Sequence, residues 1–293
     1  MADPPASKKP KLDLRENKAN IMLEKAAKGK YGIAGYNIEG LLATVRAAES
    51  RRSPAMILLF PWAQSYSGAA LASAASSLAR SASVPITLHL DHAQTPEAIR
   101  AAAETGCYDS IMVDMSHHEK EENLQMTKEL TSYCHERGIV TEAEPGRIVG
   151  GEDGVADTKE LEAVMTSPEE AMQFAQTGID WLAPAFGNVH GNYGPRGIQL
   201  DYERLGKVNE AVGKEGVKLA LHGTDGFDEE IYGKCIQGGI TKVNINGIMN
   251  KEYTRVRGEM PEAIVTELME KGTDAMQKAV ETCMDMLGSS GKA

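Results

Sequence analysis

Short strand-like runs alternate with helical patterns along the whole chain, and this alternation predicts a single (β/α)₈ barrel, the TIM-barrel class. Eight such units fit into about 260 residues, the usual size of a closed barrel. No change of composition marks a linker, and no GxGxxG pattern follows the first strand, which argues against a dinucleotide-binding sheet. We expect residues 1–19 to form a flexible tail and residues 20–293 to form the barrel domain.

The strand predictions rest on short apolar runs, each followed by a polar or glycine-containing turn. Parallel strands are buried on both faces, so continuous apolar runs are expected in place of a polar–apolar alternation. In chain order the predicted strands are 31–38, 55–60, 85–90, 110–113, 139–142, 179–183, 217–221 and 241–245.

The helix predictions rest on helical periodicity and on residues that favour helix starts. Thr95 precedes Pro96, and Ser167 precedes Pro168, so each pair supplies a capping hydroxyl and a proline at the first turn. The predicted helices include 41–51, an Ala- and Ser-rich helix at 68–80, 96–105, 120–137 and a helix from 168 that ends at Gly178. An extra carboxy-terminal helical segment, 249–287, is expected either to cap the barrel or to form a subunit contact.

Composition narrows the class of partner and the compartment. The chain has 293 residues, 42% of them hydrophobic, with 31 Lys and Arg against 42 Asp and Glu, a net charge of −11. This charge argues against a general nucleic-acid binder or an anionic membrane surface. The four cysteines show no CxxC spacing, and no apolar run is long enough for a membrane helix or signal peptide. We therefore expect a cytoplasmic protein that binds neither nucleic acid nor membrane.

Three histidines follow three separate strand-like runs. His92, His190 and His222 each stand beside an Asp or Gly at a predicted carboxyl end. A barrel brings the ends of distant strands to one opening, and three imidazoles with a free fourth position are a ligand set for catalytic zinc. The alternative for each one alone is an ordinary core or helix-flanking histidine. Three together favour a metal site, although Co²⁺ or Fe²⁺ would also suit such ligands.

Acidic residues near these histidines are candidates for proton transfer. Asp91 precedes His92 and is either an acid/base group or a residue that orients a ligand histidine. Glu144 and Glu152 belong to strand five and the glycine-rich loop after it, which is either a mobile lid or an acidic surface loop. We leave His89 out of the site because we expect it to point away from Asp91.

Six motifs occur in an order that resembles the class II, zinc-dependent fructose-bisphosphate and tagatose-bisphosphate aldolases, over residues 20–285. They are Leu90-Asp91-His92, Ser110 to Ser116, Glu142-Ala143-Glu144-Pro145-Gly146 with Gly150 to Gly154, Gly187-Asn188-Val189-His190-Gly191, Leu221-His222-Gly223 and Lys242-Val243-Asn244-Ile245. The resemblance implies a lyase of carbohydrate metabolism, including glycolysis, that cleaves a ketose bisphosphate such as fructose 1,6-bisphosphate through a metal-stabilised enediolate. It also implies a dimer or tetramer.

The resemblance also implies roles for individual residues. His92, His190 and His222 match the zinc ligands, and Glu144 matches a glutamate that joins the metal in one of its positions. Asp91 matches the residue that handles the hydroxyl proton, and Glu152 matches the residue that moves the proton next to the carbonyl. Asn37 and Asn244 match groups that hold the dihydroxyacetone portion of the substrate. Gly191 and Gly223 match backbone positions near a phosphate and a monovalent cation.

The sequence departs from the family pattern where the family binds phosphate. Asp225 replaces a serine that the family usually carries, which places an anion where an anion should bind. The other departures are Gly194, Thr224, Asn246, Gly247 and the segment Phe60-Pro61-Trp62-Ala63. Arg147 or Arg196 would restore a positive charge, and the bulk of Phe60 and Trp62 suggests a less polar pocket wall.

Three hypotheses follow from these observations. The first is a zinc aldolase that acts on a ketose phosphate or bisphosphate. The second is the same chemistry on a different, non-phosphorylated substrate. The third is a catalytically silent zinc-binding scaffold, against which the joint presence of Asp91, Glu152 and the three histidines argues. Departures at Gly194 and Asp225 separate the first hypothesis from the second.

Overall fold

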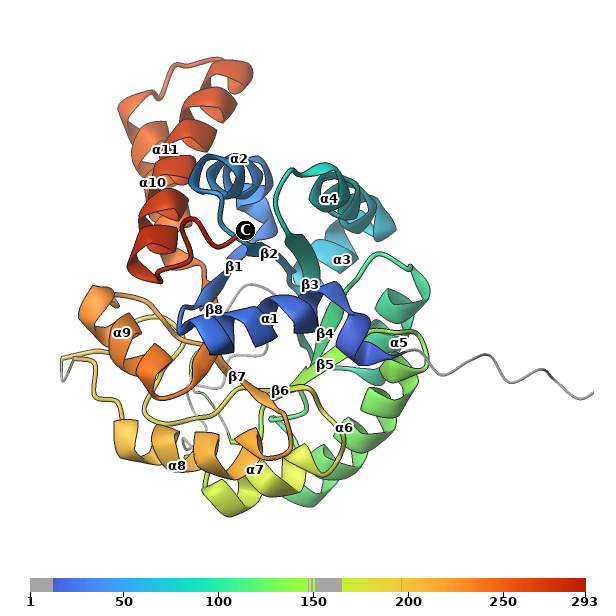
Figure 1. Cartoon of the computed structure of the whole chain (residues 1–293). Helices are drawn as coiled ribbons and strands as arrows, with labels where there is room; N and C mark the ends of the chain where they lie inside the picture. Colours follow the sequence, from blue (N-terminus) through green and yellow to red (C-terminus); the bar gives the residue numbers. More distant parts are fainter. Residues whose placement is uncertain (1–12, 147, 149, 151–164, 196) are drawn as a thin grey trace, which may run out of the picture.

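Eight parallel strands close into a barrel in the order β1 to β8 in the computed structural model, which describes residues 13–146, 148, 150, 165–195 and 197–293 (Figure 1). Each strand pairs in parallel with its neighbours in the sequence, and β8 pairs with β1. The (β/α)₈ prediction is confirmed. The strands are β1 (Ile33–Asn37), β2 (Ala55–Leu59), β3 (Ile86–Ala93), β4 (Ser110–Val113), β5 (Val140–Ala143), β6 (Trp181–Leu182), β7 (Lys218–Leu221) and β8 (Ile240–Ile245).

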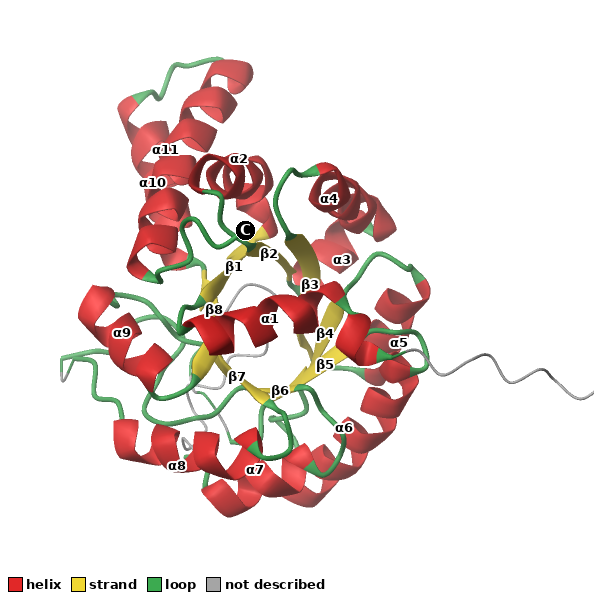
Figure 2. Ribbon diagram, viewed as in Figure 1, coloured by secondary structure: helices red, strands yellow, loops and turns green. Residues whose placement is uncertain are grey.

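Helices surround the barrel in a ring that Figure 2 shows in red around the yellow strands. Those of the ring are α2 (Leu41–Arg51), α3 (Pro61–Ser67), α4 (Ala69–Ser81), α5 (Pro96–Glu104), α6 (Lys120–His135), α7 (Pro168–Ala175), α8 (Tyr202–Gly213) and α9 (Glu229–Gln237). The caps expected at Thr95 and Ser167 form, because each hydroxyl accepts a hydrogen bond from a backbone N–H in the first turn. Outward-facing strand residues pack against these helices and form the main core.

A helix that the sequence analysis did not identify, α1 (Lys18–Gly29), follows the short 3₁₀ turn η1 (Leu14–Glu16) and lies across one opening of the barrel (Figure 1). Its apolar face, with Met22 and Leu23, packs on inward-facing strand residues that include Trp181. This helix precedes β1, so the opening that it covers is at the amino-terminal ends of the strands. The carboxyl ends remain for the site.

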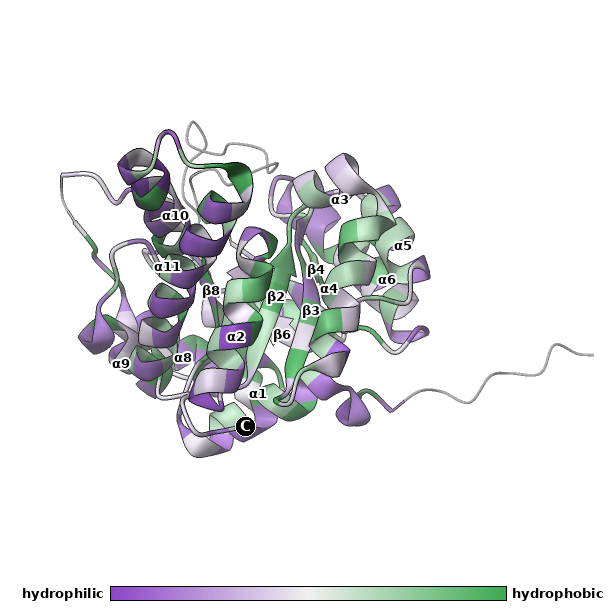
Figure 3. Cartoon of the chain, turned by 90° about the horizontal axis from the view of Figure 1, so that it is seen from above, coloured by the Kyte–Doolittle hydropathy of each residue, from purple (hydrophilic) through white to green (hydrophobic). Residues whose placement is uncertain are grey.

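Two predicted helical segments differ in detail from the structure. The helix expected at 68–80 is α4, and the short helix α3, which was not predicted, precedes it. Gly68 separates the two and adopts a positive φ of 56° that only glycine takes without strain. The segment expected at 249–287 is α10 (Gly247–Glu259) and α11 (Val265–Met286), which lie beside α2 on the outside of the barrel (Figure 3). No helix in the described ranges is long and apolar enough to cross a membrane. The division into a tail of residues 1–19 and a barrel domain stays a prediction.

Candidate active site at the carboxyl ends of the strands

A bulge in β3 turns two neighbouring residues toward the barrel opening. The register between β3 and β4 shifts between Leu90 and Ala93, and His92 has a φ of 46°, which is rare outside glycine. Strand alternation alone would send Asp91 and His92 to opposite faces. The bulge places both side chains in buried positions at the carboxyl end of β3.

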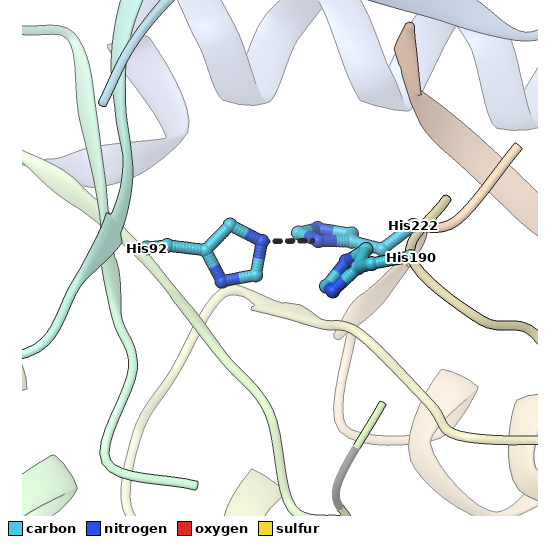
Figure 4. A group of neighbouring side chains, drawn as sticks. All are labelled: His92, His190 and His222. Carbon is cyan, nitrogen blue, oxygen red and sulfur yellow. Dashed lines mark hydrogen bonds between the residues drawn. The ribbon is translucent and has the colours of Figure 1, made fainter. Parts of the chain in front are cut away.

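The three histidines converge as predicted (Figure 4). His92 ends β3, His222 directly follows β7, and His190 lies in the loop after β6. One nitrogen from each ring lies within 4.8 Å of the others, and Nε2 of His92 is 3.0 Å from Nδ1 of His222. A tetrahedral zinc ion with Zn–N bonds of about 2.0–2.1 Å separates its nitrogens by about 3.4 Å. The observed spacing therefore suits a metal ion with little rearrangement.

The far nitrogens of two rings are hydrogen-bonded to carboxylates, and this fixes where each ring carries its proton. Nδ1 of His92 is 2.7 Å from Oδ2 of Asp114, and Nε2 of His222 is 2.8 Å from Oε1 of Glu142. Each of these nitrogens must donate to its carboxylate, so in a neutral ring the other nitrogen, which faces the second ring, carries a lone pair. Two such lone pairs at 3.0 Å repel unless a positive charge lies between them, and either a proton on Nε2 of His92 or a metal ion supplies one.

The charges around the histidines favour a cation here. Burial lowers the pKa of an imidazole, but the charges of Asp91 and Asp114 raise the pKa of His92 to about 10. Burial and the charges of His92 and His222 lower the pKa of His190 well below its usual range, so that ring is neutral. Nε2 of His190 is buried and has no hydrogen-bond partner among the described residues, which leaves a nitrogen free to bind a metal.

Glu144 has one free carboxylate oxygen and interacts electrostatically with His92, although it is not part of the cluster of three histidines. Its Oε1 accepts a hydrogen bond from the backbone N–H of Ile148, whereas Oε2 is buried without a partner in the described ranges. Burial and the charge of Asp114 raise the pKa of Glu144 well above its usual range. A carboxyl that resists ionisation in the metal-free site is suited to bind a metal ion, whose charge would reverse this shift.

Asp91 is fully buried and held by a neighbouring strand. Its Oδ2 accepts a hydrogen bond of 2.6 Å from Nδ2 of Asn244 on β8. Burial alone would raise the pKa of Asp91, but the charges of Lys242 and His92 lower it well below its usual range. The expectation that His89 points away from Asp91 was wrong, because residues two apart on a strand share a face. Nε2 of His89 is 3.3 Å from Oδ1 of Asp91.

A buried lysine for which the sequence indicated no role lies beneath the site. Nζ of Lys242 on β8 is 2.8 Å from Oε2 of Glu142, 3.4 Å from Nε2 of His89 and 3.7 Å from Oδ1 of Asp91. Burial raises the pKa of Glu142, but Lys242 and the hydrogen bond from His222 lower it to about 2. Lys242 therefore keeps ionised both Asp91 and the carboxylate that orients His222.

A pocket of about 180 Å³ brings together the six residues predicted to bind substrate. They come from the ends of β1, β7 and β8 and from the loop after β6: Asn37, Gly191, Gly223, Asp225, Asn244 and Asn246.

The departures noted in the sequence fall in different places relative to this pocket. Phe60 also lines it and stacks on His92 with ring centroids 6.1 Å apart. Trp62 is 42% exposed, stacks on Tyr66 and is not among the described lining residues, so only Phe60 forms the apolar wall. Glu152, Arg147 and Arg196 lie outside the described residues.

The fold and the site together define a (β/α)₈-barrel protein with a candidate three-histidine metal centre at the carboxyl ends of its strands. Residues 17–292 match the family described as fructose-bisphosphate aldolase class-II. The chain belongs to this family of lyases, as its resemblance indicated.

Relatives of known name support the same assignment. The chain is 58% identical to a protein of Coccidioides immitis (strain RS), over 97% of both chains, whose naming as a fructose-bisphosphate aldolase is itself provisional. It is 35% identical to the fructose-bisphosphate aldolase of Streptococcus pneumoniae serotype 4, over 94% of this chain and 98% of the relative.

Solved structures show the same fold. The Coccidioides immitis protein superposes with a TM-score of 0.92 over 95% of this chain and 98% of that one. The YdjI aldolase from Escherichia coli K12 is 30% identical and superposes with a TM-score of 0.83, over 94% of this chain and 98% of its own. The fold of this chain therefore agrees with both structures over nearly their whole length, although the two relatives carry different names.

Proposed function

We propose that this chain catalyses the reversible aldol cleavage of a ketose with a zinc ion held by His92, His190 and His222. The observation that carries the proposal is the pair of imidazole nitrogens 3.0 Å apart, each with a carboxylate on its far side. Zinc bound there would polarise the ketone and stabilise the negative charge left when the carbon–carbon bond breaks.

Proton transfer is assigned to two acidic residues. Asp91, ionised and held by Asn244, accepts the proton of the hydroxyl group on the carbon that is cleaved. Glu152 is proposed from the sequence to protonate the carbon next to the carbonyl. Glu144 joins the metal in one of its positions, a role that its free Oε2 supports. A silent zinc scaffold would need no buried, ionised Asp91 beside the ligands.

The pocket residues are assigned to substrate binding. Asn37 and Asn244 hold the dihydroxyacetone portion, and Gly191 and Gly223 offer backbone groups to a phosphate or a monovalent cation, a proposal supported by their place in the pocket wall. Fructose 1,6-bisphosphate is the first ketose to test because the named relatives act on it by name. The four free cysteines fit a reducing cytoplasm and a role in carbohydrate metabolism such as glycolysis.

A homo-oligomer, a dimer or tetramer, is part of this proposal. Three apolar side chains at the α10–α11 end are exposed to solvent: Ile264 by 69%, Val265 by 73% and Met269 by 55%. Clustered exposed apolar residues are typical of surfaces that meet a partner. Light scattering of the protein and of a Val265→Asp variant would test this, and a monomer at micromolar concentration would contradict it.

The activity is tested by aldol condensation of glyceraldehyde 3-phosphate with dihydroxyacetone phosphate or with dihydroxyacetone, and by cleavage of fructose 1,6-bisphosphate. Each assay compares zinc-loaded with EDTA-treated protein. We expect condensation with at least one donor that EDTA abolishes and Zn²⁺ restores, and a loss of at least about a hundredfold in Asp91→Asn. No turnover of either donor by protein that holds one zinc per chain would contradict the proposed enzyme.

A further inference from the structure

The pocket beside the histidines carries a negative charge and no positive one among the described residues that line it. Its wall consists of asparagines, glycines, Thr224, Phe60 and a single ionisable side chain, Asp225. A phosphate group carries close to two negative charges at neutral pH and is normally met by Lys, Arg or several free backbone N–H groups. The composition of this wall is suited to a neutral, hydroxyl-rich ligand.

Asp225 takes the position at which the first turn of α10 would attract an anion. A Cβ atom built on Gly247, the first residue of α10, would lie 2.2 Å from Oδ1 of Asp225, so the carboxylate packs directly against the helix start. The first turn of α10 contains no acidic residue, and the side chain of Asn246 does not cap it. Asp225 therefore places its own negative charge at the positive end of the helix dipole.

Unsatisfied amide groups in the pocket wall show what kind of ligand it lacks. Asn37 is 2% exposed, and neither its Nδ2 nor its Oδ1 has a hydrogen-bond partner in the described part of the chain. Nδ2 of Asn244 donates a hydrogen bond to Oδ2 of Asp91, and its buried, unpartnered Oδ1 can only accept. Two acceptors, Oδ1 of Asn244 and the carboxylate of Asp225, thus face a ligand that must donate. A hydroxyl group donates and accepts, whereas an ionised phosphate only accepts.

We propose that Asp225 occupies the anion position of this pocket, so that the pocket takes the hydroxymethyl end of a ketose and excludes a phosphorylated one. This inference rests on the proposed function, because it identifies the substrate class of that same site. The aldol donor, the part of the ketose that becomes the enediolate, is then dihydroxyacetone and not its phosphate. The ketose that is cleaved carries no phosphate on its first carbon.

The test measures binding by calorimetry with zinc-loaded and metal-free protein. The ligands are dihydroxyacetone, dihydroxyacetone phosphate and inorganic phosphate, and the variants are Asp225→Ser and Asp225→Asn, the second of which keeps the shape of the side chain. The control is Glu215→Ser, which removes the same charge at an exposed site between α8 and β7. We expect dihydroxyacetone phosphate to bind both Asp225 variants at least about tenfold more tightly than the natural chain, with dihydroxyacetone little changed.

Three results would overturn the inference. One is tighter binding of dihydroxyacetone phosphate than of dihydroxyacetone by the natural chain. Another is that dihydroxyacetone phosphate binds no more tightly to whichever Asp225 variant folds than to the natural chain. The last is an equal gain in the affinity of Glu215→Ser for dihydroxyacetone phosphate, which would make net charge the cause. Deuterium exchange at the hydroxymethyl carbon of dihydroxyacetone, followed by NMR, tests the proposed function separately. If no deuterium exchange occurs but the Asp225 variants still bind dihydroxyacetone phosphate more tightly, the proposed aldol chemistry is rejected and the assignment of the pocket is kept.

Discussion

Replacing Lys242 with methionine removes the one buried ammonium group that the described residues place beneath the site. Met has a similar length, so the packing is kept while Glu142 and Asp91 lose their shared cation. All three side chains have no solvent exposure. Removing one partner of a buried ion pair typically costs about 3–5 kcal/mol, because the remaining charges stay desolvated without compensation. Spread over the unfolding entropy of a chain of this size, that lowers Tm by about 5–8 °C.

The assay is urea unfolding and differential scanning calorimetry of the metal-free protein, which keeps metal binding out of the comparison. The control is Lys234→Met on α9, whose ammonium lies 2.7 Å from Glu230 in a pair that is 49% and 75% exposed. The two pairs have nearly equal lengths and differ in burial, so we expect the control to lose at most about 0.5 kcal/mol.

A double-mutant cycle separates the ion pair from general damage to the core. We expect Lys242→Met combined with Glu142→Gln to lose less stability than the sum of the single changes, because the second change removes the stranded carboxylate. A loss in Lys242→Met no greater than in Lys234→Met would refute the reasoning. So would full additivity in the cycle, because it would show that Lys242 and Glu142 do not stabilise each other.

Three further predictions concern the metal, the backbone and pH. Metal-free protein should bind one Zn²⁺ per chain and gain about 2.7 kcal/mol at a free concentration of 100 Kd, whereas His190→Ala should show neither effect in calorimetry. Gly223→Ala should lower the free energy of unfolding by about 1–3 kcal/mol because the new Cβ would lie 2.5 Å from the carbonyl oxygen of Val189. The control Gly216→Ala, also at positive φ but in open space, should lower it less in urea unfolding. Hydrogen bonds from the backbone N–H and the hydroxyl of Ser83 lower the pKa of Glu49. The stabilisation from these hydrogen bonds is therefore present above the ordinary pKa of a glutamate and is lost as the pH falls through the lowered pKa of Glu49. Glu49→Gln should lack this part of the pH dependence of the unfolding free energy between pH 7 and pH 3.

The sequence predicted the barrel and the meeting of the histidines because both follow from local patterns. Strand–helix alternation requires parallel strands, and parallel strands in a barrel share one carboxyl face. His92, His190 and His222 therefore converge wherever the strands lie in detail. Helix α3 was missed because its seven residues are too few to show a clear helical period.

The residues behind the histidines could not be found in this way. Glu142 lies on β5, His89 on β3 and Lys242 on β8, and each belongs to an apolar run that indicates a core strand. Their contacts depend on the stagger of strands that are far apart in the barrel, and a shift of one residue would turn each side chain to the other face. The bulge at His92 is likewise invisible in the sequence, although it decides that Asp91 and His92 reach the same opening.

The charges buried around the histidines explain why a doubly charged cation suits this site. Asp91, Asp114 and Glu142 have lowered pKa values and are ionised, whereas the raised pKa of Glu144 keeps that carboxyl neutral. Lys242 offsets one of the three negative charges and leaves two. A proton on His92 would balance only one of these. A divalent ion on three neutral imidazoles balances both, and uncompensated charge is costly where no water reaches. The same balance predicts that Lys242→Met, which adds one net negative charge beside the ligands, should weaken stability more in metal-free than in zinc-loaded protein.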